Sequence, residues 1–311
     1  MKKILVIGGS RYFGKHLVTL ERDAGNEVTV LNRGSALPPR GVGRLIADRE
    51  DETGLRTALG ERTFDVVFDQ VCYTPRQAET ARRVFAGRTG RYVMTSTMEV
   101  HDPAAPTPEA RAYAEGKRRA EAVLGAESAF GHVAVRAAHV LGGGRAEFTG
   151  RLAHYVERIG AGIPVAVHAA PYPTSFVHHH EIARFLHWAG QQEFTGPVNA
   201  ASHGELDVLG LSGAVAEHVG RAPRLRTVPD GSEASPFSFD RAYAMDNGRA
   251  AALGFRFERL ADWLPEAIGE SAAALRGEPG RAAPGAGRRT AGPTGPRPGA
   301  PRELLLPSCS H

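Results

Sequence analysis

The sequence has little cysteine, little lysine and no long hydrophobic run, and each shortage excludes a class of protein. Its 311 residues contain two cysteines, Cys72 and Cys309, which are too few and too far apart for a disulfide framework. No apolar run approaches the ~20 residues that a membrane-spanning helix needs. The N-terminus lacks the small-residue cleavage site of a signal peptide. We therefore expect a reduced, cytoplasmic protein without a membrane partner.

A basic face on the folded part is also missing, although the pI is 9.3. Between Arg276 and His311 there are six arginines and two glutamates, which account for the whole formal charge of +4. Residues 1–275 are formally neutral, whereas a nucleic-acid-binding domain carries its excess charge on a folded face. Segment 276–311 also holds seven glycines and seven prolines, a composition that predicts a disordered tail. A nucleic-acid partner is therefore not expected.

The chain does have the apolar content of a globular protein, 42%, and short β-branched runs that alternate with helical segments. We expect strands at 4–7, 27–32, 44–48, 64–69 and 91–97, and helices after 14, at 53–59, at 75–85 and at 113–124. This alternation predicts an α/β fold, a Rossmann-type doubly wound parallel sheet. Residues 1–275 should form one domain, with a cofactor-binding core mainly in 1–141 and a smaller C-terminal substrate-binding lobe mainly in 142–275.

A glycine-rich turn follows the first predicted strand. Its residues are Gly8, Gly9, Ser10, Arg11, Tyr12, Phe13 and Gly14. A strand, such a turn and a helix in this order predict the opening of a dinucleotide-binding unit. The unpaired N–H groups and the dipole of a helix N-terminus bind a pyrophosphate there. The glycine spacing alone is a weak signal, and its position makes it stronger.

The end of the second predicted strand bears on the choice between NAD and NADP. An acidic residue at this position accepts a hydrogen bond from the ribose 2′-hydroxyl of NAD. This chain has Asn32 followed by Arg33 instead, so no carboxylate repels a 2′-phosphate. Arg33 and Arg11 can both bind that phosphate. We predict NAD(P) as the cofactor, with NADP favoured; two solvated surface arginines are the alternative interpretation.

Other polar or small residues fall on the same carboxyl edge of the predicted sheet. Asp48 ends the third strand, Val71 follows the fourth, and Thr95–Thr97 end the fifth. Ligands of doubly wound sheets bind along this edge. We therefore include Asp48 and Val71 among the cofactor-binding residues.

Tyr113 and Lys117 lie four residues apart on a predicted helix and so share one face. A nearby ammonium favours the phenolate of a tyrosine, whose ordinary pKa is about 10. Lysine is rare here, since only four of the 38 basic residues are lysines, and a guanidinium cannot replace it in this role. With Thr97 or Ser96 holding a substrate oxygen, the set predicts hydride transfer. An accidental pattern with a surface lysine is the alternative.

Two further features invite a chemical role that we do not assign. His178, His179, His180 and Glu181 form a run of metal-binding residue types, but consecutive residues do not converge on one ion. We expect no metal site and interpret the run as packing or helix capping. Cys72 has no base beside it in the pattern and is expected to be a small buried side chain.

Together these motifs resemble the short-chain dehydrogenase/reductase superfamily, and within it the extended, NAD(P)-dependent epimerase/dehydratase branch. The resemblance covers about residues 1–275 and includes the glycine turn, the Tyr113–Lys117 pair, Phe176–Ala183 and Asp246–Phe255. It implies that an oxidoreductase acts on a carbinol or carbonyl carbon of a small, sugar-like or secondary metabolite. The implied roles are acid/base for Tyr113, pKa partner and ribose anchor for Lys117, substrate-orienting hydroxyl for Thr97 or Ser96, and adenine contact for Asp48.

The chain departs from that branch at two places. Arg11 replaces the middle glycine of the turn, a form that resembles an atypical subgroup with nucleic-acid-associated members. Thr174 and Ser175 stand where many nucleotide-sugar enzymes have an arginine that suits a diphosphate. A non-catalytic or RNA-associated cofactor-binding protein on the same fold is therefore the alternative function. The sequence does not decide the oligomeric state, and a homodimer stays open as an assembly.

Overall fold

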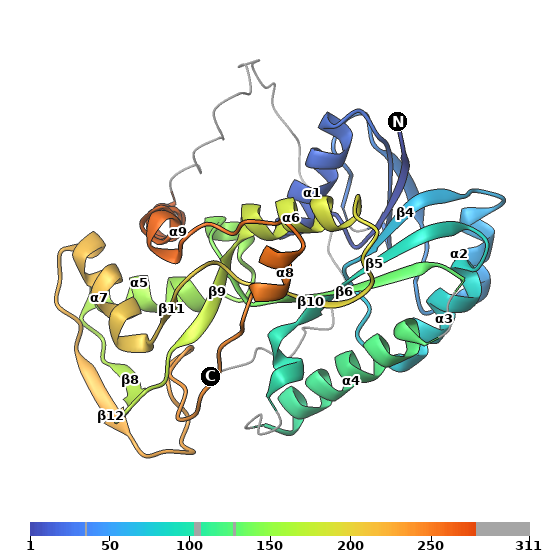
Figure 1. Cartoon of the computed structure of the whole chain (residues 1–311). Helices are drawn as coiled ribbons and strands as arrows, with labels where there is room; N and C mark the ends of the chain where they lie inside the picture. Colours follow the sequence, from blue (N-terminus) through green and yellow to red (C-terminus); the bar gives the residue numbers. More distant parts are fainter. Residues whose placement is uncertain (35, 103–106, 127–128, 278–311) are drawn as a thin grey trace, which may run out of the picture.

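The computed structural model describes residues 1–34, 36–102, 107–126 and 129–277, and a seven-stranded parallel sheet lies at its centre (Figure 1). The strand order is β10-β6-β5-β4-β1-β2-β3. The strands are β1 (Lys3–Ile7), β2 (Glu27–Asn32), β3 (Gly43–Ile46), β4 (Phe64–Asp69), β5 (Thr89–Thr97), β6 (Gly131–Ala137) and β10 (Gly196–Ala200). The expected Rossmann-type sheet is confirmed.

The central strands form because their apolar runs are buried on both faces, as in most parallel sheets. In β1, Ile4 to Ile7 are each at most 1% exposed. The edge strand β3 is shorter than predicted and stops at Ile46, so Asp48 lies beyond it. The reason is that its only neighbour, β2, ends at Asn32, which pairs with Ile46.

Helices cover both faces of this sheet (Figure 1). One face packs against α1 (Tyr12–Asp23) and α6 (His179–Ala189), in a core that includes Leu17, Val18 and Ile182. The other face packs against α2 (Glu52–Leu59), α3 (Pro75–Phe85) and α4 (Pro108–Gly125). Helix α4 begins at Pro108, five residues before Tyr113, so Tyr113 and Lys117 lie in the middle of this helix.

The second half of the chain builds a smaller layer and also returns to the first. Two small sheets have the orders β11-β9-β7 and β12-β8. Their strands are β7 (His139–Leu141), β8 (Val165–His168), β9 (Thr174–His178), β11 (Glu205–Leu206) and β12 (Leu225–Val228), with helices α5 (Arg151–Ala161), α7 (Val208–Val219), α8 (Gly248–Ala252) and α9 (Leu260–Leu275). Short helical turns are η1 (Met98–His101) and η2 (Gly144–Ala146). Both α6 and β10 rejoin the main sheet.

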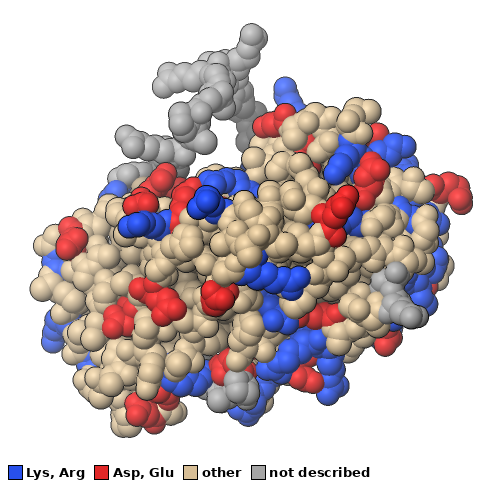
Figure 2. All heavy atoms as spheres, viewed as in Figure 1, with Lys and Arg blue, Asp and Glu red and all other residues tan. Residues whose placement is uncertain are grey.

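The remaining expectations concern the membrane, the cysteines and the tail. Among the described residues, no helix is long and apolar enough to cross a membrane. Cys72 is fully buried, as predicted, and burial raises the pKa of its thiol to about 12, which leaves it unreactive. Cys309 and the tail from residue 278 lie outside the described residues. Figure 2 shows acidic and basic side chains interspersed over the visible face.

Candidate functional site

The carboxyl ends of β1 and β4 lie side by side in the middle of the sheet. From β1 the chain runs outward to β2 and β3, and it then crosses back to β4 on the other side of β1. Such a reversal of strand order leaves a crevice where doubly wound sheets bind their ligands. The glycine turn follows β1, and Gln70 and Val71 follow β4, so both segments lie at this reversal of the strand order.

The glycines of the turn are required by close packing. Gly8 has a φ of +84°, and a Cβ there would lie 2.7 Å from Val71 Cγ1. A Cβ on Gly9 would lie 2.5 Å from Val6 Cγ1 and 2.8 Å from Val18 Cγ2. The turn therefore holds the N-terminus of α1 directly against the ends of the two central strands.

The N-terminus of α1 has no cap of its own. The N-cap residue Arg11 makes no side-chain capping bond, and the first turn contains no acidic residue. Four other helices are capped by a side chain, from Asp51, Thr74, Thr107 and Asp207. The first N–H groups of α1 have no intrahelical partner and suit an external anion, so the turn fits the pyrophosphate of a dinucleotide.

Gln70 and Tyr12 complete the turn. The side chain of Gln70 lies so close to Gly14 that a Cβ there would clash with Oε1. Its Nε2 is buried and has no hydrogen-bond partner among the described residues, so this donor also fits a phosphate ligand. Tyr12 donates from its hydroxyl to the carbonyl of Gly142 over 3.1 Å, and its ring packs on Phe13. Tyr12 thereby ties the turn to the second half of the chain.

Asn32 at the end of β2 organises the loop that follows. Its Nδ2 donates to Ser10 Oγ over 2.7 Å and to the Ala36 carbonyl over 3.0 Å. The neighbouring side chain of Arg33 is exposed, as is that of Arg11 in the turn. The polar group at the end of β2 is thus an amide fixed to the turn, and the side chains of Arg11 and Arg33 lie at the surface.

Asp48 is exposed, and the next residue, Arg49, makes a buried ion pair that the sequence analysis missed. The guanidinium of Arg49 pairs with Asp69, which ends β4 and is fully buried. The same carboxylate accepts a hydrogen bond from the Tyr92 hydroxyl. Asp69 was visible in the sequence as an acid at the end of a buried strand, but its partner was not.

Lys117 is buried at the carboxyl end of β5, with 2% of its surface exposed. Its Nζ donates to the Thr95 carbonyl over 2.9 Å. The same atom lies 4.5 Å from the centre of the Tyr73 ring and 5.9 Å from that of Tyr113. Burial lowers the pKa of Lys117 to about 8, against the opposite effect of Asp69. The ammonium thus sits between a strand end and two phenol rings.

Tyr73 is a second residue that the sequence analysis did not assign. Its ring centre lies 6.2 Å from that of Tyr113, and burial raises the pKa of Tyr73 to about 12. Gly116 allows this arrangement, because a Cβ there would lie 2.5 Å from the Tyr73 carbonyl oxygen. In the sequence, the glycine in the middle of the predicted helix, immediately before Lys117, indicated that another segment packs closely there.

The two candidate hydroxyls of β5 are in different situations. Ser96 donates to the Glu121 carboxylate, which also accepts from Arg136. Thr97 points to the opposite face, because side chains alternate along a strand. Its Oγ1 accepts from the Glu99 N–H over 3.3 Å at the start of η1. Burial raises the pKa of Glu99, a second acid that the sequence analysis missed.

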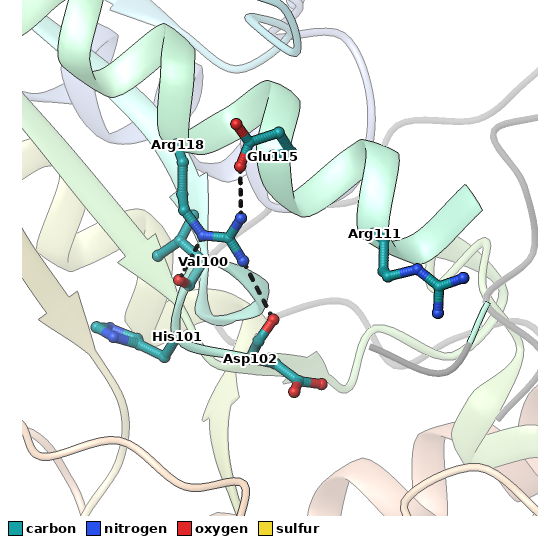
Figure 3. Close-up of a pocket in the computed structure, with 6 residues that line it drawn as sticks. All are labelled: Val100, His101, Asp102, Arg111, Glu115 and Arg118. Carbon is teal, nitrogen blue, oxygen red and sulfur yellow. Dashed lines mark hydrogen bonds and ion pairs between the residues drawn. The ribbon is translucent and has the colours of Figure 1, made fainter. Parts of the chain in front are cut away.

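A hollow of about 460 Å³ lies between η1 and the N-terminal half of α4 (Figure 3). Arg118 reaches from α4 to the carbonyls of Val100, over 2.9 Å, and Asp102, over 3.1 Å. The Asp102 carboxylate pairs with Arg241 from the second half of the chain. These contacts fix η1, and with it the end of β5, between α4 and the smaller layer.

The fold that carries this site is shared by several solved epimerases, and it is the fold that the resemblance implied. UDP-glucose 4-epimerase from Thermus thermophilus, solved with NAD, has a TM-score of 0.63 and 23% identity, over 88% of this chain and 99% of its own. The Bordetella bronchiseptica enzyme WbmG, solved with NAD and UDP, has a TM-score of 0.69 and 16% identity, over 89% and 95%. UDP-N-acetylglucosamine 4-epimerase from Bacillus cereus has a TM-score of 0.66 and 17% identity, over 89% and 100%. No family model and no curated protein matches the sequence.

Proposed function

We propose that this chain is an NAD(P)-dependent oxidoreductase of the epimerase/dehydratase type. It transfers a hydride to or from a carbinol or carbonyl carbon of a small molecule. The observation that carries the proposal is the buried ammonium of Lys117 at the end of β5, 5.9 Å from the centre of the Tyr113 ring. Burying an ammonium is costly, so a lysine at this place in an arginine-rich chain supports a chemical role.

In the proposed mechanism Tyr113 moves the proton of the substrate hydroxyl, and Lys117 favours the phenolate form that accepts it. Thr97 orients the substrate oxygen. It is preferred to Ser96, because the Ser96 hydroxyl donates its one proton to Glu121, whereas the Thr97 hydroxyl is engaged as an acceptor by the Glu99 N–H. A bound nicotinamide supplies the acceptor or donor of the hydride.

In the proposal the cofactor is held at the glycine turn and at the ends of β1, β2 and β4. The uncapped first turn of α1, from Tyr12 to Gly14, suits the pyrophosphate, and Gln70 adds a buried donor beside it. In the proposal Val71 borders the nicotinamide and Asp48 the adenine. NADP is favoured over NAD because Asn32 and the exposed Arg33 present no carboxylate to a 2′-phosphate.

The substrate in this proposal is a small sugar-like or secondary metabolite. UDP-sugars or UDP accompany several of the similar structures. In this chain, however, Thr174 and Ser175 are buried, and Ser175 accepts from the Met245 N–H over 2.9 Å. This pair offers no cation to a diphosphate, which supports a substrate without a nucleotide.

Mass spectrometry of the molecules released from the denatured protein tests the cofactor. A retained dinucleotide is expected for an epimerase or dehydratase, which regenerates it in every cycle. An empty site with NAD(P)H consumption is expected for a reductase. Failure to bind NAD or NADP in solution, with none released, would contradict the proposal.

Tyr113→Phe tests the chemistry. With a panel of ketones and sugars, turnover should fall by about 10²–10⁴-fold, because the proton-transfer group is lost. Cofactor affinity should stay unchanged, since the phenyl ring remains. Tyr172→Phe is the matched control, because Tyr172 is 46% exposed. Equal turnover in both variants would remove Tyr113 from the mechanism.

A further inference from the structure

Four histidines gather where α1 packs on α6, beside the glycine turn. His16 lies on α1, His178 ends β9, and His179 and His180 begin α6. His179 Nδ1 is 3.1 Å from His16 Nε2. The ring centre of His180 is 4.1 Å from each of these two rings. The Tyr12 ring stacks on His179 with centres 5.8 Å apart, so the cluster adjoins the turn.

We propose that His16, His179 and His180 bind a divalent transition-metal ion such as Zn²⁺. One nitrogen from each lies within 4.8 Å of the other two. In a tetrahedral site with Zn–N distances of about 2.0–2.1 Å, ligand nitrogens are roughly 3.4 Å apart. The 3.1 Å between His16 and His179 is already close to this value. Three imidazoles suit zinc, copper or nickel, and a water would complete the four ligands.

The surroundings of the cluster suit a metal. Metal ligands are neutral imidazoles, and His179 is buried while His16 is half-buried. His180 is exposed, which gives an ion a path to the site. The positive end of α6 opposes a cation, whereas the Glu270 carboxylate, 3.7 Å from His179 Nε2, favours one.

A carboxylate that can orient one of the proposed ligands, His179, also lies close to it. His179 Nε2 is buried without a hydrogen bond among the described residues, and it lies 3.7 Å from a Glu270 oxygen. When Nδ1 binds the ion, Nε2 carries the proton and faces that carboxylate. Metal-bound histidines are commonly oriented in this way.

The expectation of no metal site considered only the consecutive histidines. His16 is 163 residues away from His179 and comes from another helix, so no local spacing could reveal it. Two consecutive rings at the start of α6 supply the remaining ligands. A second set of possible metal ligands consists of the more buried residues His178, His179 and Glu270, here called the inner group.

Titration of the full-length, untagged and chelator-stripped protein with Zn²⁺, in competition with a chromophoric chelator, tests the site. We expect one ion per chain, and Co²⁺ should give the visible absorption of a tetrahedral site. His180→Gln, at an exposed position, should weaken binding by at least about 100-fold, and Glu270→Gln by about 10–100-fold. His218→Gln, exposed on α7, is the control and should bind like the natural chain.

His178→Asn separates the two arrangements. Unchanged zinc affinity supports the proposed ligands. Loss of binding in His178→Asn together with retained binding in His180→Gln would overturn them in favour of the inner group. No stoichiometric binding by the natural chain would overturn the site altogether. These measurements need no dinucleotide, so their outcome is independent of the proposed oxidoreductase function.

Discussion

At position 117 we expect a lysine to fit better than the larger arginine. The side chain is 2% exposed and ends at the Thr95 carbonyl. Lys117→Arg should lower the free energy of unfolding by about 1–3 kcal/mol through overpacking, and it should also reduce turnover. Lys117→Met keeps the volume, so it should fold normally yet lose activity. Denaturant unfolding and NAD(P)H-coupled turnover measure the two effects, and full activity in Lys117→Met would contradict the role.

Arg33 tests the cofactor preference. Its guanidinium is exposed beside Asn32, where a 2′-phosphate is expected. Arg33→Ala should weaken NADPH binding by about tenfold, or ~1.4 kcal/mol, and leave NADH binding unchanged. Arg226→Ala, exposed on β12, serves as the control. Equal affinities for NADH and NADPH, unaffected by Arg33→Ala, would refute the preference for NADP.

His132 links stability to pH. Burial lowers the pKa of His132 to about 4, and neither ring nitrogen has a hydrogen-bond partner among the described residues. The unfolded chain therefore binds one more proton than the folded chain between about pH 6.5 and 4. Its contribution to stability, present above pH 6.5, falls by up to ~1.4 kcal/mol per pH unit as the pH drops.

His132→Leu should remove that part of the pH dependence, whereas the exposed-site variant His218→Leu should not. Denaturant unfolding from pH 7 to pH 4 measures the slopes. Parallel curves for His132→Leu and the natural chain would show that folding does not lower the pKa of His132.

The sequence could place residues on the ligand edge but could not say which side chains are engaged. Thr97 and Ser96 were equivalent in the pattern. They differ because Glu121, 25 residues from Ser96, bonds to the Ser96 hydroxyl. In the same way Asp69 was recognisable as the end of a strand, but its partner Arg49 comes from the loop after β3. Such pairings depend on packing between elements.

At the scale of elements, Gly116 sets how closely α4 approaches the loop after β4. Gly116→Ala would place a Cβ 2.5 Å from the Tyr73 carbonyl oxygen, a backbone atom that cannot easily move. We expect a loss of about 1–3 kcal/mol in unfolding free energy and reduced turnover, because Lys117 moves with the helix. Gly213→Ala, in α7 with nothing within 4 Å, should instead stabilise by about 0.5–1 kcal/mol.

Thermal or denaturant unfolding of both glycine variants checks this contrast. Equal stabilities would show that a side chain at position 116 fits between α4 and the loop after β4 without strain. A stable Gly116→Ala variant with normal turnover would also separate the position of α4 from the proposed chemistry.

The pattern of apolar residues predicted most elements well. The bounds of β2, β4 and α3 are those expected, because each is a buried run with a clear start and end. The prediction of β3 was too long, since the strand has a neighbour on one side only. The contact of α1 with α6 was not predicted, and it is this contact that brings His16 to His179.

At the scale of the molecule, the distribution of charge argues against the RNA-associated alternative. Residues 1–275 are formally neutral, and both signs are interspersed over the face in Figure 2. A chain ending at residue 277 keeps every described element but loses most of the excess positive charge. Because RNA binding depends on such charge, this shortened chain should show no salt-dependent retardation on RNA. Gel-shift assays at two salt concentrations measure this. Retardation of the shortened chain would favour the RNA-associated alternative.

The parallel, doubly wound sheet followed from the alternation of strands and helices. The return of α6 and β10 to the main sheet did not follow. These elements come after the smaller layer has begun, and no sequence period marks their partner. Long-range pairings of this kind decide how the second half of the chain packs on the first.

The most direct test is the crystal structure of the protein with bound NADP⁺. We predict the pyrophosphate at the N-terminus of α1, Lys117 Nζ within about 3 Å of the nicotinamide ribose, and the ring of the nicotinamide facing Tyr113. A dinucleotide bound elsewhere, or with its nicotinamide away from Tyr113 and Lys117, would contradict the account.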